Sequence, residues 1–152
     1  MPTMLSMRVS HYDAAGAQRL RDDLTHLEEA ARSADATVPW LARREGDESF
    51  RLVTVSLDGR LAGYAAGTLR GDHVELQRLL TVPAAEHAEP GLTQTLVDVI
   101  IELFALRHPK VSLASDSRAL GHLMHVGWRP VVAEDLADGQ IMVEHIGVHR
   151  HG

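Results

Sequence analysis

The chain has 152 residues, 45% of them hydrophobic and 24% charged, and this length and composition suit one globular domain with a sizeable core. It contains no cysteine, which excludes disulfides, thiolate metal sites and a cysteine nucleophile. Its formal net charge is -6 and Lys110 is its one lysine, so it lacks the clustered cations that a nucleic-acid-binding surface needs.

The apolar stretches of the sequence predict no membrane segment. The N-terminus lacks a basic start followed by a long apolar run, and the later apolar stretches are too short and interrupted to span a bilayer. We therefore expect a soluble, cytoplasmic protein. We further expect a single domain over residues 1–147 and a flexible tail at 148–152, where no apolar pattern continues.

A strand and a helix are predicted first. Residues 5–11 alternate loosely, as a strand does. The helix that follows has apolar residues at three- and four-residue spacing, which are Ala17, Leu20, Leu24, Leu27 and Ala31. Residues 37–49 then suit a short helix or a surface loop.

Three strands form a predicted antiparallel meander in the middle of the chain. Residues 50–57 and 60–69 have extended patterns, and the dipeptide Asp58-Gly59 between them is typical of a tight hairpin. Residues 74–82 follow as the third strand.

The second half alternates helices and strands. Its predicted elements are a loop at 83–91, a helix at 92–104, strands at 111–114, 128–133 and 140–146, and a helix at 118–126. Asp116 or Ser117 can cap the last helix, of which Leu120, Leu123 and Met124 form the packed face, and Gly127 suits a left-handed end. The element order predicts an α/β fold of mixed α+β type, with a largely antiparallel mixed sheet and helices on both faces.

Three segments of this pattern resemble one superfamily. They are the hairpin at 55–64, the strand at 74–83, and an Asp116-Ser117-Arg118-Ala119 start that leads to Gly127-Trp128. In sequence and order they are similar to the GCN5-related N-acetyltransferases (GNAT). The resemblance covers nearly the whole chain and implies the GNAT-like acyl-CoA N-acyltransferase fold. It also implies acetyl-CoA as cosubstrate, with pantetheine bound by the backbone of Leu80, Thr81 and Val82.

The pyrophosphate loop departs from the family pattern of Gln or Arg, two residues, Gly, one residue, and Gly or Ala. The aligned residues here are Ala88, Glu89, Pro90, Gly91, Leu92 and Thr93. Pro90 removes a donor amide, and a Glu89 carboxylate beside a diphosphate is repelled by about 1 kcal/mol even in water. The resemblance assigns the pyrophosphate to Gly91, Leu92 and Thr93, through backbone amides and the Thr93 hydroxyl at a helix start.

Strand alternation places Glu75 and Gln77 on one face and Val74, Leu76, Arg78 and Leu80 on the other. Acyl transfer needs a base or water relay for the attacking amine, so Glu75 is the candidate base and Gln77 would orient the water. The alternative is an exposed sheet face on which Arg60 or Arg70 balances Glu75 across the strands.

Other candidate residues have ordinary explanations as well. Leu123 falls where many family members have a tyrosine that protonates the CoA thiolate, and His122 or His125 replaces that acid only if the helix is rotated. Trp40 is a candidate substrate-binding residue, with simple packing as the alternative. The histidines at 122, 125, 145, 149 and 151 lack a clear third ligand, so no metal site is predicted.

The sequence therefore predicts an N-acyltransferase that uses acetyl-CoA or another acyl-CoA on a small-molecule amine by direct attack. The alternatives are a non-catalytic GNAT-fold binding, regulatory or interaction module, and different chemistry in the same cleft. A homodimer through the last strands is a further hypothesis, because exposed strand edges can pair.

Overall fold

The computed structural model describes residues 6–31, 41–70, 73–104, 110–132, 136 and 138–145. The described elements are, in chain order, β1 (Met7–Tyr12), α1 (Ala14–Gln18), α2 (Arg21–Ala31), β2 (Phe50–Leu57), β3 (Arg60–Arg70), β4 (His73–Thr81), α4 (Pro83–Ala88), α5 (Leu92–Phe104), β5 (Lys110–Ala114), α6 (Arg118–His125), β6 (Trp128–Val131) and β7 (Gln140–His145). No helix within these ranges is long and apolar enough to cross a membrane.

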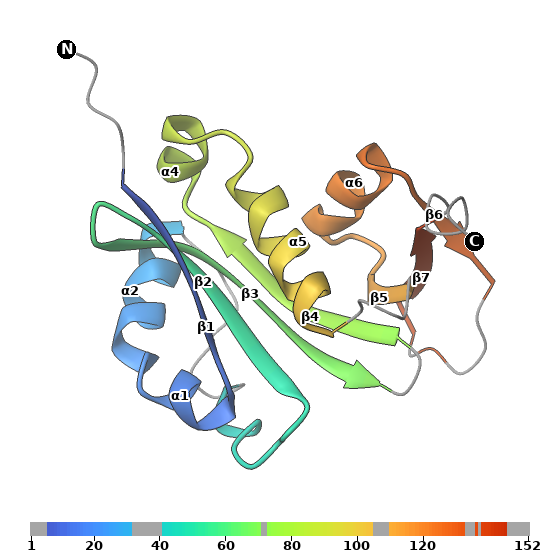
Figure 1. The fold of residues 1–152 in the computed structure, drawn as a ribbon, viewed down its shortest axis with the longest axis horizontal. Helices are drawn as coiled ribbons and strands as arrows, with labels where there is room; N and C mark the ends of the chain where they lie inside the picture. The colour runs from blue at the N-terminus through green and yellow to red at the C-terminus, as the bar shows by residue number, and fades with distance from the viewer. Residues whose placement is uncertain are drawn as a thin grey trace.

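Within the described residues, the strands form one seven-stranded sheet in the order β1-β2-β3-β4-β5-β7-β6 (Figure 1). β4 and β5 pair in parallel, and every other neighbouring pair in this sheet is antiparallel. The predicted mixed, largely antiparallel sheet is confirmed.

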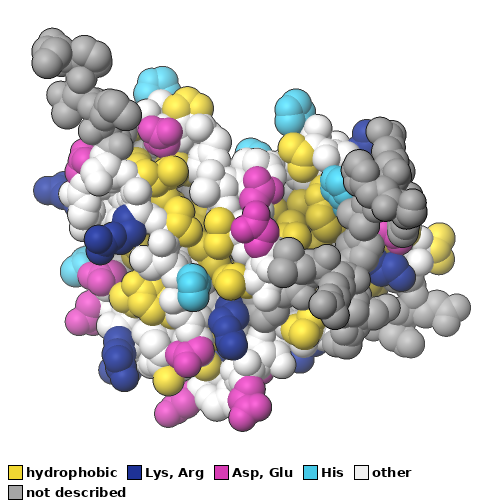
Figure 2. All heavy atoms as spheres, viewed as in Figure 1, with side chains coloured by type: hydrophobic (Ala, Val, Ile, Leu, Met, Phe, Trp, Pro, Cys, Tyr) yellow, Lys and Arg dark blue, Asp and Glu magenta, His cyan; other side chains and the backbone are white. Residues whose placement is uncertain are grey.

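Helices cover both faces of the sheet, as predicted. On one face α1 and α2 bury a cluster that includes Leu24, Phe50 and Tyr64. On the other face α5 and α6, which lie side by side, bury a cluster that includes Leu96 and Leu123 (Figure 1). Figure 2 shows acidic side chains over α5, with hydrophobic side chains on both sides of them.

Local signals at turns and caps are confirmed. Asp58 and Gly59 have φ values of 51 and 82, the left-handed pair that a tight two-residue hairpin requires. Ser117 caps α6 by accepting a hydrogen bond from the Ala119 amide at 3.2 Å. Gly127, with φ 108, follows the end of α6 in the left-handed conformation.

The structure corrects three local predictions. The first helix is divided in two: Asp13 caps α1 through the Gly16 amide at 2.8 Å, α1 ends at a C-cap on Arg19, and α2 begins at Arg21. The predicted loop at 83–91 contains α4, which begins with Pro83 at a position where the proline ring suits a helix start. Met124 is 39% exposed, so it does not belong to the packed face of α6.

Glycine allows β3 to approach β4 and α5 closely. A Cβ atom added to Gly63 would lie 2.8 Å from the Leu80 carbonyl oxygen and 2.9 Å from Cγ2 of Thr81. It would also lie 3.2 Å from Cδ1 of Leu96 on α5. A methyl group here therefore requires a shift of backbone, which cannot yield as a flexible side chain does.

We predict that Gly63→Ala lowers the free energy of unfolding by about 1–3 kcal/mol, the usual cost of overpacking a core. Urea denaturation followed by circular dichroism measures the change. Gly121→Ala in α6 is the matched control, because a Cβ there meets no atom within 4 Å. This control should stabilise by roughly 0.4–1 kcal/mol. A Gly63→Ala protein as stable as the wild type would contradict the close approach.

Candidate active site at the separation of β4 and β5

The two parallel strands at the centre of the sheet separate after a short contact. β4 and β5 pair only at Val74 with Val111 and at Glu75 with Ser112. Beyond that point β4 continues to Thr81 against β3 alone, while β5 continues to Ala114 against β7 (Figure 1). We call the edge of β4 from Leu76 to Thr81 that β5 leaves unpaired the β4–β5 split. Its backbone groups can pair with an extended ligand.

Antiparallel pairing with β3 decides which backbone groups face the split. The Val82 amide donates to the Ala62 carbonyl at 2.9 Å, so the backbone of Val82 faces β3. Backbone groups alternate along an antiparallel strand, so Leu80 also faces β3, whereas Leu79 and Thr81 face the split.

This alternation decides which of the residues predicted to hold pantetheine face the split. Thr81 presents its backbone to the split, as Leu79 also does, whereas Leu80 and Val82 face β3. Pantetheine binding itself stays a prediction. The register of the strands cannot be predicted from the sequence, so it was not possible to predict which backbone groups of β4 pair with β3.

The start of α5 lies next to the end of β4. Gly91 precedes the helix with φ 96, and its carbonyl accepts from the Thr95 amide at 2.9 Å. The Thr93 side chain is 1% exposed, and its hydroxyl lies 3.3 Å from the Thr81 hydroxyl. The Thr93 hydroxyl therefore joins α5 to β4, and its assignment to a pyrophosphate stays a prediction. What this helix start offers an anion is its dipole and first-turn backbone.

The loop before α5 offers little to a diphosphate. The Glu89 amide donates to the Ala85 carbonyl at 2.9 Å, which ends α4, and Pro90 has no amide hydrogen. The Gln94 side chain donates to Asp98 at 2.6 Å. Binding of a diphosphate here would depend on the start of α5, and the negative charge of the Glu89 carboxylate would repel the diphosphate.

A β-bulge in β4 places polar side chains on the α1 and α2 face of the sheet. Ala66 pairs with Arg78 and Gly67 with Leu76, so Gln77 is the extra residue on β4. The bulge shifts the alternation, and Arg78 Nε lies 3.4 Å from the Tyr64 hydroxyl in the α1 and α2 cluster.

The bulge also corrects the predicted faces of β4. Val74 and Leu76 belong to the α5 cluster, but Leu80 packs with the α1 and α2 cluster, and Arg78 lies on that same face. The prediction that these four residues share one face is therefore wrong beyond Leu76. The prediction assumed that side chains alternate strictly between the two faces of β4, and the extra residue of the bulge breaks this alternation.

Glu75 and Gln77 lie together, as predicted. Gln77 Nε2 donates to Glu75 Oε1 at 2.6 Å, and the Thr68 hydroxyl donates to Gln77 Oε1 at 3.1 Å. Arg70 forms an ion pair with Glu75 Oε1 at 3.4 Å, so Arg70 rather than Arg60 is the cross-strand partner. The Glu75 side chain keeps 32% of its surface exposed, which leaves the carboxylate accessible to water.

The remaining predicted residues stand apart from this arrangement. Leu123 is fully buried in the α5 cluster, so the position of the family tyrosine contributes to the core. His122 is half-buried and His125 is exposed. Trp40 lies outside the described residues. Among the described residues, no three His, Cys, Asp or Glu side chains are grouped so that they could hold a metal.

No family model matches the sequence, and no curated protein matches it significantly. Solved structures do match. The PaiA N-acetyltransferase of Thermoplasma acidophilum in complex with coenzyme A has a TM-score of 0.63 at 13% identity, over 91% of this chain and 98% of that chain. The ribosomal-protein-S18-alanine N-acetyltransferase of Escherichia coli has a TM-score of 0.65 at 17% identity, over 91% and 92%.

A third similar structure is the aminoglycoside 6'-acetyltransferase type Ii, with a TM-score of 0.66 at 17% identity over 90% of this chain and 94% of that chain. The chain has the GNAT fold. The resemblance read from the sequence is confirmed at the level of the fold. In this GNAT fold, the β4–β5 split and the start of α5 occupy adjacent positions at one end of β4.

We predict that Thr93→Val lowers the free energy of unfolding by about 1–3 kcal/mol, because it leaves the Thr81 hydroxyl buried without its partner. The double variant Thr81→Val/Thr93→Val should cost less than the sum of the two single variants, by roughly 0.5–3 kcal/mol. Chemical denaturation of the four proteins gives this coupling.

Thr25→Val is the control, because the Thr25 hydroxyl bonds to the Arg21 carbonyl on an exposed helix surface. Its effect should stay within about 0.5 kcal/mol. Additive effects of the two buried threonines would show that their hydroxyls do not interact.

Proposed function

We propose that the protein is an acyl-CoA-dependent N-acyltransferase that transfers an acetyl group to a small amine by direct attack. The observation that carries the proposal is the β4–β5 split, where the backbone of Leu79 and Thr81 faces away from β3. The likeness to CoA-bound and amine-acetylating proteins of the same fold supports it.

The split suits a ligand with alternating amides. Pantetheine is an extended chain with two amide groups, and it can add to a strand edge through main-chain hydrogen bonds. Leu79 and Thr81 would provide those bonds. The start of α5 would then face the diphosphate with the positive end of its dipole. Pro90 has no amide hydrogen and the Glu89 carboxylate repels a diphosphate, so both weaken diphosphate binding at the start of α5. We therefore expect the pantetheine arm to contribute much of the affinity for acyl-CoA.

Glu75 and Gln77 would serve the acceptor. The amine nitrogen attacks the thioester carbonyl carbon, a C–N bond forms, and the C–S bond breaks. The proton that leaves the amine would pass to the Glu75 carboxylate through a water that Gln77 helps to hold. Leu123 has no proton to give, so the departing thiolate would take its proton from solvent. The net charge of -6 gives a weak preference for a cationic amine.

The second candidate function is a GNAT-fold binding module without catalysis. Two observations favour it: the loop before α5 has lost amide donors, and the position of the usual thiolate acid is core. Binding of the thioester without transfer to any amine would support this candidate.

We predict that acetyl-CoA and CoA bind with dissociation constants in the micromolar range in calorimetric titration at moderate salt. This range corresponds to a binding free energy of about -8 kcal/mol or weaker. Glu89→Gln should tighten binding by up to about fivefold, because removal of its charge relieves roughly 1 kcal/mol of repulsion toward the diphosphate.

Glu45→Gln is the matched control, since Glu45 is exposed on a turn far along the chain from α5. It should leave the affinity unchanged. No heat with about millimolar acetyl-CoA for either the wild type or Glu89→Gln would exclude a CoA-dependent enzyme.

We predict that Glu75→Gln lowers kcat by about 10²- to 10⁴-fold, the usual range for loss of a general base, and leaves the affinity for acetyl-CoA unchanged. Steady-state acetylation of the best amine from a screen gives kcat. Arg70→Gln is the control, because it removes the ion pair and keeps the carboxylate. It should change kcat by less than about tenfold. Wild-type turnover by Glu75→Gln would exclude Glu75 as the base.

A further inference from the structure

A cavity lies on the α1 and α2 face, and none of its lining residues belongs to β4 or α5. It has a volume of about 640 Å³, and its walls come from β1, α2 and the β2–β3 hairpin. α2, which forms one wall, also packs against β3 and β4. The volume falls in the range of small-molecule sites in proteins.

The floor of the cavity is polar where a helix-covered sheet is normally apolar. Tyr12 of β1 and Thr54 and Ser56 of β2 line it. On this face of β2, the buried Leu52 is followed by Thr54 and Ser56 toward the hairpin. The side chains of this face are therefore polar where they line the cavity and apolar before it. Burial of a hydroxyl group beneath a helix costs free energy unless water or a ligand forms a hydrogen bond with it.

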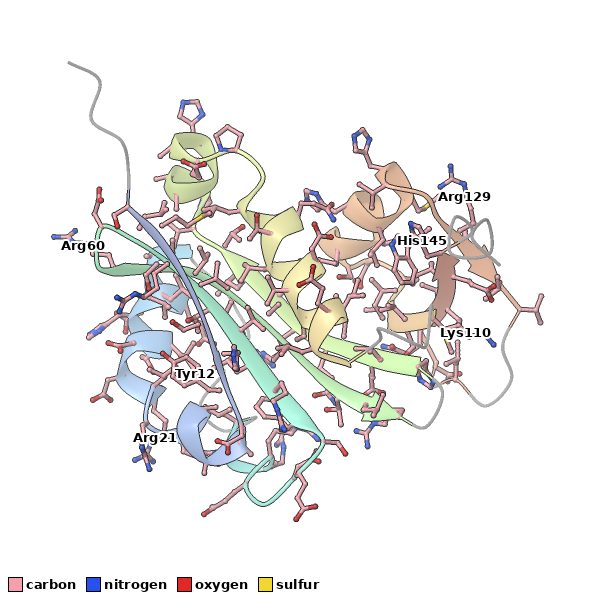
Figure 3. All side chains as sticks on the ribbon, in the orientation of Figure 1. Tyr12, Arg21, Arg60, Lys110, Arg129 and His145 are labelled. Atoms are coloured by element: carbon pink, nitrogen blue, oxygen red, sulfur yellow. The ribbon has the colours of Figure 1, made fainter. Side chains whose placement is uncertain are left out.

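The walls combine apolar side chains with opposite charges. Leu27 of α2 and Leu61 of β3 line the interior, and Asp23 of α2 faces the same cavity as Arg60 of the hairpin. Asp23 and Arg60 form no ion pair with each other, and neither pairs with another side chain in the described part of the chain. Figure 3 shows Arg60 on the hairpin at the edge of the molecule and Tyr12 at the C-terminal end of β1.

We propose that this cavity binds a small zwitterion with an apolar body, of the amino-acid type. Its ammonium group binds Asp23, its carboxylate binds Arg60, and its apolar part lies against Leu27 and Leu61. The two charges stand on separate walls, α2 and the hairpin, as the two ends of one zwitterion require. The hydroxyl floor holds the water or polar atoms between them.

This ligand site is independent of the acyl transfer proposed above. The lining of the cavity includes α2 residues but neither Glu75 nor Gln77.

The test is calorimetric titration of the full chain with L-phenylalanine, without acyl-CoA. Phenethylamine lacks the carboxylate and 3-phenylpropanoate lacks the ammonium group. We expect L-phenylalanine to bind with a dissociation constant of about 1 mM or tighter, and each analogue to bind at least roughly tenfold more weakly.

The variants locate the ligand. Asp23→Asn should weaken L-phenylalanine by about tenfold and leave 3-phenylpropanoate unchanged, and Arg60→Gln should weaken L-phenylalanine and leave phenethylamine unchanged. Ala30→Trp should block the cavity from its exposed wall, whereas Glu29→Trp, on the same helix but outside the cavity, should not. Asp22→Asn is the matched control for Asp23.

Two results would overturn the proposal. The first is no heat with L-phenylalanine at about 10 mM. The second is binding that survives Ala30→Trp, Asp23→Asn and Arg60→Gln but falls in Glu75→Gln, since the ligand would then occupy the acceptor side of the split. Retained affinity in Glu75→Gln together with loss in Ala30→Trp supports the second site, whatever the outcome for acyl transfer.

Discussion

The backbone of β4 must find hydrogen-bond partners, and β5 meets that need only at Val74 and Glu75. Beyond those positions β4 is held by β3 on one side, while its other edge faces the split. A strand edge with free backbone groups is normally a liability in a folded protein. Within a sheet that continues on both sides, the same edge is the surface that the proposed binding of an extended, amide-bearing ligand would use.

Two further features hold this edge in place. Gly63 lets β3 approach β4 closely, and the paired hydroxyls of Thr81 and Thr93 join the end of β4 to the start of α5. The dipole of α5 is thus oriented relative to the split by contacts that are themselves buried. The same contact engages the Thr93 hydroxyl, so the proposed anion site at this helix start would rely mainly on backbone groups.

The bulge at Gln77 separates two roles along one strand. Before it, Val74 and Leu76 pack under α5, while Glu75 and Gln77 form a polar network with Arg70 and Thr68. After it, the strand presents Leu80 to the α1 and α2 cluster. The α1 and α2 face therefore carries the acceptor side of the proposed reaction near β4, and a separate charged cavity near β1 and β2.

The sequence by itself determined the order of the elements apart from α4 and the division of the first helix, the hairpin at Asp58-Gly59, the Ser117 cap and the left-handed Gly127, and through them the GNAT resemblance. Each of these signals acts within a few residues, so local conformational preference is enough to predict it. The bulge at Gln77, the backbone groups of Leu79 and Thr81 at the split and the buried Thr93 hydroxyl were decided only in the tertiary structure. They depend on strand register and on contacts between distant segments, which local preference does not specify.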